Sequence, residues 1–139
     1  MFRPSSPTLL QRVRARIVKS KRQIFLPADF ADLSGRVQVY RALKQLVDAG
    51  ELVRVGSGLY ARARLSSLTG EPVPAVPGGF KYLARAALDR LGVRWEPGSR
   101  ELAFSEGRTN QIPVNAVVRL RDRCRRRIAW GGMELRVEH

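Results

Sequence analysis

The chain has 139 residues, enough for one ordinary domain or for two small domains that share a core. It carries 26 lysines and arginines against 12 acidic residues, for a formal net charge of +14. A field of this sign attracts polyanions such as nucleic acid, anionic lipid or an acidic protein, but it says nothing about the fold. Because the chain has one cysteine, an internal disulfide is excluded and a structural zinc site is not expected.

The charge and apolar patterns also argue against a membrane protein. No apolar run approaches the roughly 18 residues that a spanning helix needs, so we expect no membrane partner. Arg12, Arg14 and Arg16 are interleaved with apolar residues, which is unlike a signal peptide, and a cytoplasmic location is therefore expected. Residues 1–64 hold 13 basic and 4 acidic side chains, and residues 65–139 hold 13 and 8, so the amino-terminal half is the more basic one.

The first third of the chain predicts two helices joined by a short strand. The first helix starts at Ser6-Pro7, where serine can act as a cap and proline is tolerated in the first turn, and it runs to about Lys19. A short apolar stretch at Gln23–Phe25 is too brief for a helix. Pro27 can open a second helix that ends at about Leu33.

A third helix and a hairpin follow. After a tight turn with a capping serine at Ser34-Gly35, apolar residues at helical spacing predict a helix from Arg36 to about Ala49. Two β-like runs, Leu52–Val55 and Leu59–Arg62, flank a glycine-rich turn typical of a hairpin. Residues 1–64 are therefore predicted to form a winged helix-turn-helix domain.

The remainder is predicted to be a linker and a second unit. Residues 65–79 are rich in proline and glycine, as expected of a linker or a surface strap. A helix is predicted from Phe80 to Leu91. Strand-like pieces follow at Val93–Glu96, Glu101–Ser105, Gln111–Leu120, Arg126–Trp130 and Glu134–Glu138. The predicted fold class is α+β, with a small helix-plus-antiparallel-sheet domain over residues 80–139.

The third helix is the candidate recognition helix. In a helix-turn-helix protein this helix enters the major groove, where arginine can pair with guanine and glutamine with adenine. The candidates to read or to position on the groove are Arg36, Gln38, Tyr40 and Arg41. The candidates to hold phosphate are Ser34, Lys44, Arg54, Ser57 and Arg62. The alternative is an ordinary solvated helix face, which is often rich in the same residue types.

A second basic feature lies near the carboxyl terminus. Six arginines occur within nine residues: Arg119, Arg121, Arg123, Arg125, Arg126 and Arg127. On a strand, alternation would place most of them on one side, where they could follow a phosphate backbone or face an acidic partner. The alternative is a solvated turn between two strands, with Asp122 as a local ion-pair partner.

Catalysis is poorly supported by the residue types. The single histidine, His139, is the last residue, and Cys124 has no histidine near it in sequence. The carboxylates show no paired spacing, and no glycine-rich phosphate loop is present. We therefore expect no enzyme activity, no metal site and no cofactor.

Several segments together resemble the AbiEi-type antitoxin family of type IV toxin–antitoxin systems, in its short form. The segments are Ile24–Phe30, Val39–Leu46, Gly50–Tyr60, Thr69–Val73 and Thr109–Val114. The resemblance implies an amino-terminal winged helix that represses its own operon, and a neighbouring nucleotidyltransferase-like toxin. It also implies that the two proteins need not form a stable complex. Longer members carry a larger carboxyl-terminal domain for antitoxicity, so antitoxin activity of this chain stays open.

The function predicted from the sequence is that of a DNA-binding transcriptional regulator of antitoxin type. Its partner is double-stranded DNA at its own promoter or operator, and a homodimer is expected because palindromic operators pair with two-fold proteins. Two alternatives stay open. One is a protein-interaction module whose basic surface captures an acidic partner or the toxin. The other is RNA binding through the arginine-rich segment and an aromatic residue such as Trp95 or Trp130.

Overall fold

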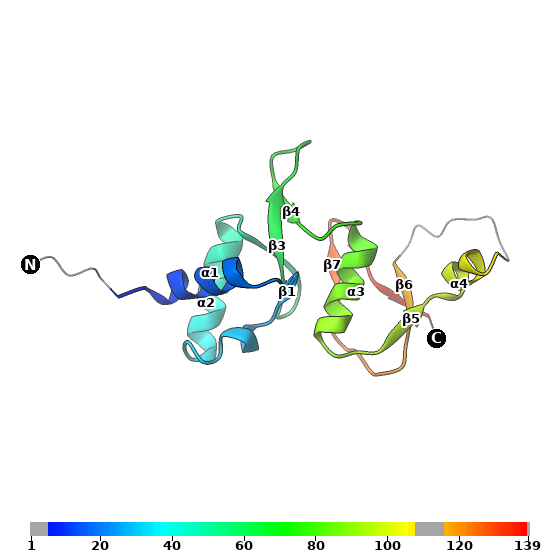
Figure 1. Cartoon of the computed structure of the whole chain (residues 1–139), viewed down its shortest axis with the longest axis horizontal. Coiled ribbons are helices and arrows are strands. Elements are labelled where there is room, and N and C mark those ends of the chain that lie inside the picture. Colours follow the sequence, from blue (N-terminus) through cyan, green and yellow to red (C-terminus); the bar gives the residue numbers. More distant parts are fainter. Residues whose placement is uncertain (1–5, 108–115, 139) are drawn as a thin grey trace, which may run out of the picture. The chain divides into compact units, whose positions relative to one another are not determined.

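The structure is a computed structural model that describes residues 6–107 and 116–138 (Figure 1). These residues fall into two compact units. The first comprises the chain up to Arg54 together with Gly58–Ala75, and the second comprises Val55–Ser57 together with the chain from Val76 onward. Helices and sheets occur in both, which confirms the α+β fold class. Predicted features at Thr109–Val114 and at His139 lie outside the described residues.

The first helix, α1 (Leu9–Lys19), begins two residues later than predicted because Thr8 is its cap. The Thr8 hydroxyl accepts a hydrogen bond from the Gln11 backbone amide at 3.2 Å, and the Gln11 side chain accepts one from the Thr8 amide at 2.8 Å. This reciprocal pair satisfies two amides that the helix itself leaves unbonded. The predicted start at Ser6-Pro7 is therefore wrong by two residues.

The helix-turn-helix segment follows as β1 (Ile24–Phe25), a 3-10 turn η1 (Pro27–Phe30) and α2 (Arg36–Asp48). The predicted second helix is thus a single 3-10 turn, in which the Asp29 carboxylate accepts a hydrogen bond from the Leu26 amide at 2.8 Å. The residue that caps α2 is Gly35, so the predicted capping role of Ser34 is wrong.

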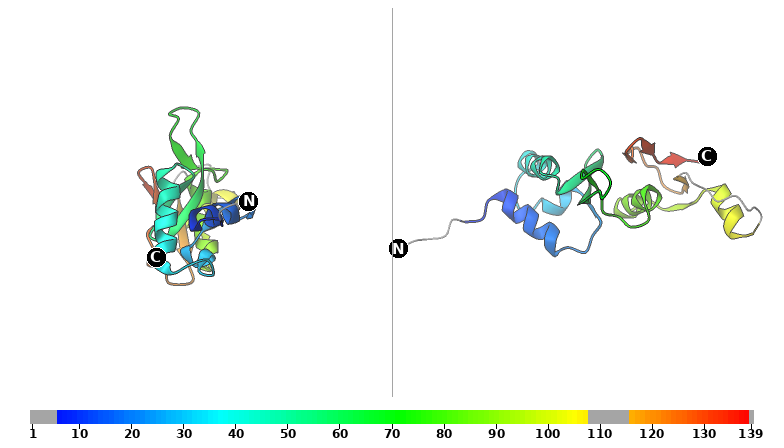
Figure 2. Two further views of the ribbon diagram at one scale, coloured as in Figure 1. Left: turned by 90° about the vertical axis from the view of Figure 1, so that its left-hand side faces the viewer. Right: turned by 90° about the horizontal axis from the view of Figure 1, so that it is seen from above.

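A sheet ordered β1-β3-β2 is made with β2 (Leu52–Gly56) and β3 (Leu59–Leu65). It belongs to the first unit except for the end of β2, which is grouped with the second unit. The hairpin between β2 and β3 turns at Ser57-Gly58, where Gly58 adopts a φ of +67° that favours glycine. A further strand, β4 (Pro72–Pro74), pairs antiparallel with β3 over Ala63–Leu65. The stretch predicted as a linker therefore contains a strand, and the β3–β4 hairpin projects from the sheet in Figures 1 and 2.

One core cluster joins the helices to the sheet. We call the β2–β3 hairpin the wing hairpin. The buried members of the cluster come from α1, β1, η1, α2 and both strands of this hairpin: Val13, Ile17, Phe25, Phe30, Val39, Ala42, Leu43, Leu46, Leu52 and Tyr60. In Figure 1, α1 and α2 lie on the same side of β1 and β3. The element order is that predicted for a winged helix-turn-helix, and the burial of one face of α2 leaves its other face to solvent.

The second unit begins with α3 (Phe80–Arg90), as predicted, and continues with β5 (Trp95–Pro97) and α4 (Ser99–Ser105). The segment predicted as a strand at Glu101–Ser105 is therefore a helix. The remaining strands are β6 (Val117–Leu120), β7 (Ala129–Trp130), β8 (Met133–Glu134) and β9 (Arg136–Val137). The three-stranded sheet β5-β6-β9 is mixed, since β6 pairs antiparallel with β5 but parallel with β9. The strands β7 and β8 form a separate antiparallel pair. No helix in the described ranges is long and apolar enough to cross a membrane.

Candidate nucleic-acid interface

The outer face of α2 carries most of the predicted groove contacts. Burial of Val39, Ala42, Leu43 and Leu46 orients the helix, so that its opposite side faces solvent. We call six exposed residues of that side the reading face: Arg36, Val37, Gln38, Arg41, Lys44 and Gln45. The acidic Asp48 is also exposed on this side, at the carboxyl end of the helix. The structure thus brings four predicted contact residues together on one helix.

Val37 is the member of the reading face that the sequence analysis missed. Its side chain is 63% exposed in the first turn of α2, where an apolar residue gains nothing from the core. An exposed apolar group at this position can contact the methyl group of thymine in a major groove. The sequence does contain a signal for this exposure, because Val37 lies outside the apolar stripe of the helix.

The Tyr40 side chain, also predicted to lie at the groove, is half-buried. The Arg36 guanidinium lies 5.5 Å from the centre of the Tyr40 ring, a cation–π distance. Tyr40 therefore supports the side chain of Arg36 beside the first turn of α2. Burial also raises the pKa of the nearby Tyr60 phenol, an effect that the charge of Arg54 opposes and that Tyr40 reinforces.

The charges of α2 run against its helix dipole. The first turn contains no acidic residue and the last turn contains no basic one, while Arg36 lies at the start and Asp48 at the end. Each of these placements is unfavourable for the isolated helix, because the positive end of the dipole lies at the amino terminus. The Gly35 cap also provides no side-chain hydrogen bond to the first amides. An anion bound at this end would compensate for both features.

Three acidic residues of the first unit are paired with α1 and the loop after it rather than with α2. Glu51 pairs with Arg14 at 2.8 Å, Asp32 with Arg16 at 2.6 Å and Asp29 with Arg22 at 3.0 Å. Within the described ranges, by contrast, Arg36, Arg41 and Lys44 have no carboxylate partner. No ion pair in the described part of the chain neutralises these three side chains, and the carboxylate on the same side of α2, Asp48, lies one turn after Lys44.

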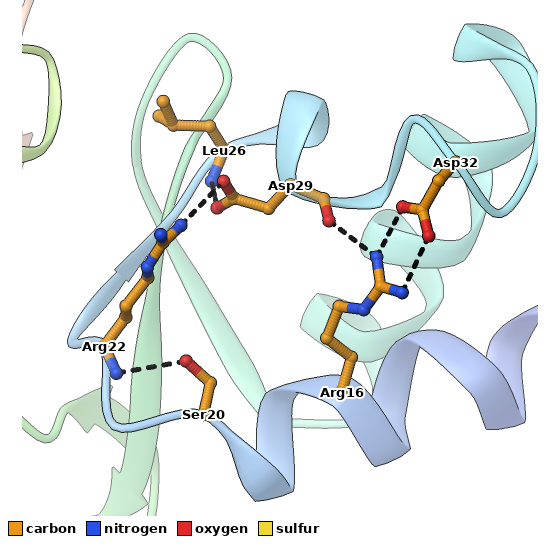
Figure 3. Close-up of polar contacts among 6 residues, drawn as sticks. All are labelled: Arg16, Ser20, Arg22, Leu26, Asp29 and Asp32. Carbon is orange, nitrogen blue, oxygen red and sulfur yellow. Dashed lines mark hydrogen bonds and ion pairs between the residues drawn. The ribbon is translucent and has the colours of Figure 1, made fainter.

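The pairs around η1 fix the entry to α2 (Figure 3). Arg16 of α1 donates to both oxygens of Asp32, at 2.6 and 2.8 Å, and to the backbone carbonyl of Asp29 at 2.8 Å. Arg22 reaches the Asp29 carboxylate from the other side at 3.0 Å. These contacts tie η1 to α1, and they assign a structural role to two carboxylates for which the sequence showed no catalytic pairing.

The Arg16–Asp32 pair predicts a specific acid sensitivity. The hydrogen bond from Arg16 lowers the pKa of Asp32 from 3.8 to about 2. Since the folded pKa lies below the unfolded one, ionised Asp32 stabilises the fold above pH 3.8, and this contribution is lost as the pH falls toward 2. We expect Asp32→Asn to be less stable than the wild type at pH 5, with the difference disappearing near pH 2. Urea denaturation at both values checks this. A difference that does not change with pH would contradict it, and Asp48→Asn is the control.

The remaining residues predicted to contact phosphate differ in exposure. Arg54 on β2 and Ser57 at the turn are exposed. Arg62 on β3 instead points inward: its guanidinium lies 5.1 Å from the centre of the Phe25 ring, and it donates to the carbonyl of Arg22 at 2.8 Å and to that of Ser20. The structure therefore places Arg62 as a brace between β3 and the loop that follows α1. Ser34, before α2, is half-buried.

The arginine-rich segment forms no continuous strand. Arg119 lies in β6, but the chain leaves the strand after Leu120, and residues 121–128 are irregular. We call residues 121–127 the arginine loop. The predicted one-sided ridge required a continuous strand, so it does not form. Three of the arginines are paired instead: Arg119 with Glu138 at 3.8 Å, Arg121 with Glu96, and Arg127 with Glu134 at 2.9 Å. Arg123, Arg125 and Arg126 are exposed and have no carboxylate partner in the described part of the chain.

Comparison with known proteins identifies a family. Residues 12–138 match the family of unknown function DUF6088. No curated protein and no solved structure matches the chain. The matched range includes both the reading face of α2 and the arginine loop, and it spans nearly the whole sequence. The chain therefore belongs to the DUF6088 family.

Proposed function

We propose that this protein is a DNA-binding transcriptional regulator that inserts α2 into the major groove of double-stranded DNA. The observation that carries the proposal is the unpaired charge of the reading face: Arg36, Arg41 and Lys44 have no carboxylate partner in the described part of the chain. In the same unit, Arg14, Arg16 and Arg22 each have one. Three cationic side chains that are exposed on one helix without a carboxylate partner suit an external polyanion.

Each side chain has a stated part in the proposed complex. Arg41 lies at the centre of the reading face and pairs with a guanine edge, while Gln38 can pair with adenine. Lys44 contacts a phosphate. On the wing, Arg54 and Ser57 contact the backbone of the duplex, which fixes register but does not read sequence. Arg62 contributes indirectly, because its contacts hold β3 against the loop that follows α1.

The resemblance to AbiEi-type antitoxins supports a more specific version of the proposal. In that version the protein is cytoplasmic, binds its own promoter as a homodimer and opposes a nucleotidyltransferase-like toxin. Identification of the neighbouring gene tests the toxin partner directly. Stable one-to-one recovery with the product of that gene, unaffected by changes in α2, would instead favour a protein-interaction module.

Binding to the protein's own promoter fragment at low salt tests the proposal. We expect Arg41→Ala to weaken specific binding by about 1–3 kcal/mol and to relax the preference for one base pair. Arg54→Ala should weaken binding to all sequences alike and reduce the salt dependence. Arg100→Ala, which removes the same charge from exposed α4, is the matched control and should leave both properties unchanged. Absence of binding by the wild type at low salt would refute the proposal, and preference for structured RNA would replace it with RNA binding.

A further inference from the structure

The arginine loop contains two kinds of arginine. Arg121 donates to Glu96 at 2.9 Å and Arg127 pairs with Glu134 at 2.9 Å, while the one acid of the loop, Asp122, is held by Arg94 at 2.8 Å. These pairs are all exposed or half-buried, so they orient the loop more than they stabilise it. Because these pairs use the nearby carboxylates, the arginines among the central residues 123–126 have no carboxylate partner in the described part of the chain.

Three uncompensated guanidinium groups lie in those four residues. Arg123 and Arg125 are exposed and make no ion pair or hydrogen bond within the described part of the chain. Arg126 donates to a neutral group, the backbone carbonyl of Ser57, at 3.4 Å. Such a concentration of like charge repels itself, and the fold supplies no internal compensation.

The contact of Arg126 shows where the loop lies. Ser57 is the turn residue of the β2–β3 wing hairpin, and both residues belong to the second compact unit. Arg123 and Arg125 therefore lie just before the residue that contacts Ser57. Arginine forks match phosphate oxygens in geometry as well as in charge.

We propose that Arg123, Arg125 and Arg126 form a second phosphate-binding segment, within the second unit, that contacts the backbone of double-stranded DNA. This inference rests on the proposed DNA-binding function and extends it from the winged helix into the carboxyl-terminal unit. The arginine loop adds affinity without reading sequence, because phosphate contacts carry no sequence information. Arg121 and Arg127 only shape the loop.

The salt dependence of promoter binding gives the first test. Each lost phosphate contact lowers the slope of log affinity against log salt by about 0.9, so Arg123→Ala/Arg125→Ala should lower it by about 2 and leave the base preference intact. The matched control is Arg121→Ala/Arg127→Ala, which removes the same charge from the same loop but from paired positions. A control variant that lowers the slope as much as the test variant would overturn the assignment. Thermal melting of both variants checks that each is folded.

The single cysteine of the chain gives the second test without further mutation. Cys124 is a free, partly exposed thiol between the two unpaired arginines. We expect saturating promoter duplex to slow alkylation of Cys124 by iodoacetamide several-fold, and to slow it much less in Arg123→Ala/Arg125→Ala.

The outcomes separate this inference from the proposed function. If promoter binding depends on Arg41 but neither the salt slope nor the alkylation rate responds as expected, the arginine loop is not a DNA contact and the function stands. If the wild type binds no DNA, the proposed function fails first. Slowing of alkylation by structured RNA but not by duplex DNA would overturn the inference and assign the loop to RNA.

Discussion

Replacing Phe30 with alanine is expected to lower the free energy of unfolding of the first unit by about 3–5 kcal/mol. The Phe30 side chain is fully buried, and its ring centre lies 6.3 Å from that of Phe25. It also belongs to the core cluster that contains Val39 and Leu43 of α2. Its removal therefore leaves a cavity between η1 and the helix that carries the reading face.

Urea denaturation followed by circular dichroism measures this loss. Leu68→Ala is the control, because the Leu68 side chain is 94% exposed at the β3–β4 hairpin and its removal should change stability by less than about 0.5 kcal/mol. Both tryptophans, Trp95 and Trp130, lie in the second unit, so their fluorescence follows that unit separately. A loss below about 1 kcal/mol, or one seen only by fluorescence, would contradict the assignment of Phe30 to the core of the first unit.

Local signals sufficed to predict most of the first unit. The apolar stripes of α1 and α2, the glycine at the wing turn and the helical spacing of α3 each report on residues close in sequence. The strand β4 was missed because its reason for being a strand is its pairing with Ala63–Leu65, which proline and glycine content does not reveal. The helix α4 was misread because a seven-residue segment is too short to show a period, although Glu101 in its first turn pairs with Lys81 of α3 at 3.0 Å.

The sequence predicted the exposed side of the candidate interface correctly on α2, where the helical spacing of apolar residues determines which side chains are exposed. Burial of Val39 and Leu43 dictates that Arg41 and Lys44 face solvent, and the structure agrees. The sequence could not separate Arg54 from Arg62, because the contacts of Arg62 with the carbonyls of Ser20 and Arg22 depend on chain folding over some 40 residues. The division of the arginine loop into paired and unpaired members has the same origin, since each glutamate partner lies on another strand.

The charge pattern of α2 indicates whether Arg36 is there for stability or for function. A helix selected for stability alone would place an acid near its first turn and a base near its last. Here Arg36 occupies the first turn, and its guanidinium covers the Tyr40 ring. The cation–π contact contributes about 0.5–1 kcal/mol at an exposed site, similar to the dipole penalty that Arg36 incurs. Stability and DNA binding should therefore respond in different ways to a change of charge at this position.

Replacing Arg36 with glutamate is expected to leave the free energy of unfolding within about 1 kcal/mol of the wild type, because a better dipole interaction offsets the lost cation–π contact. Promoter binding should weaken by about 3 kcal/mol, roughly a 100-fold rise in Kd, because a carboxylate would then face phosphate. Arg12→Glu is the matched control: it makes the same charge change at an exposed position near the start of α1, outside the reading face. Fluorescence anisotropy with the promoter fragment and urea denaturation measure the two quantities. Equal weakening by both variants would show that DNA senses only the net charge of the protein, and a large loss of stability in Arg36→Glu alone would make Arg36 a structural residue.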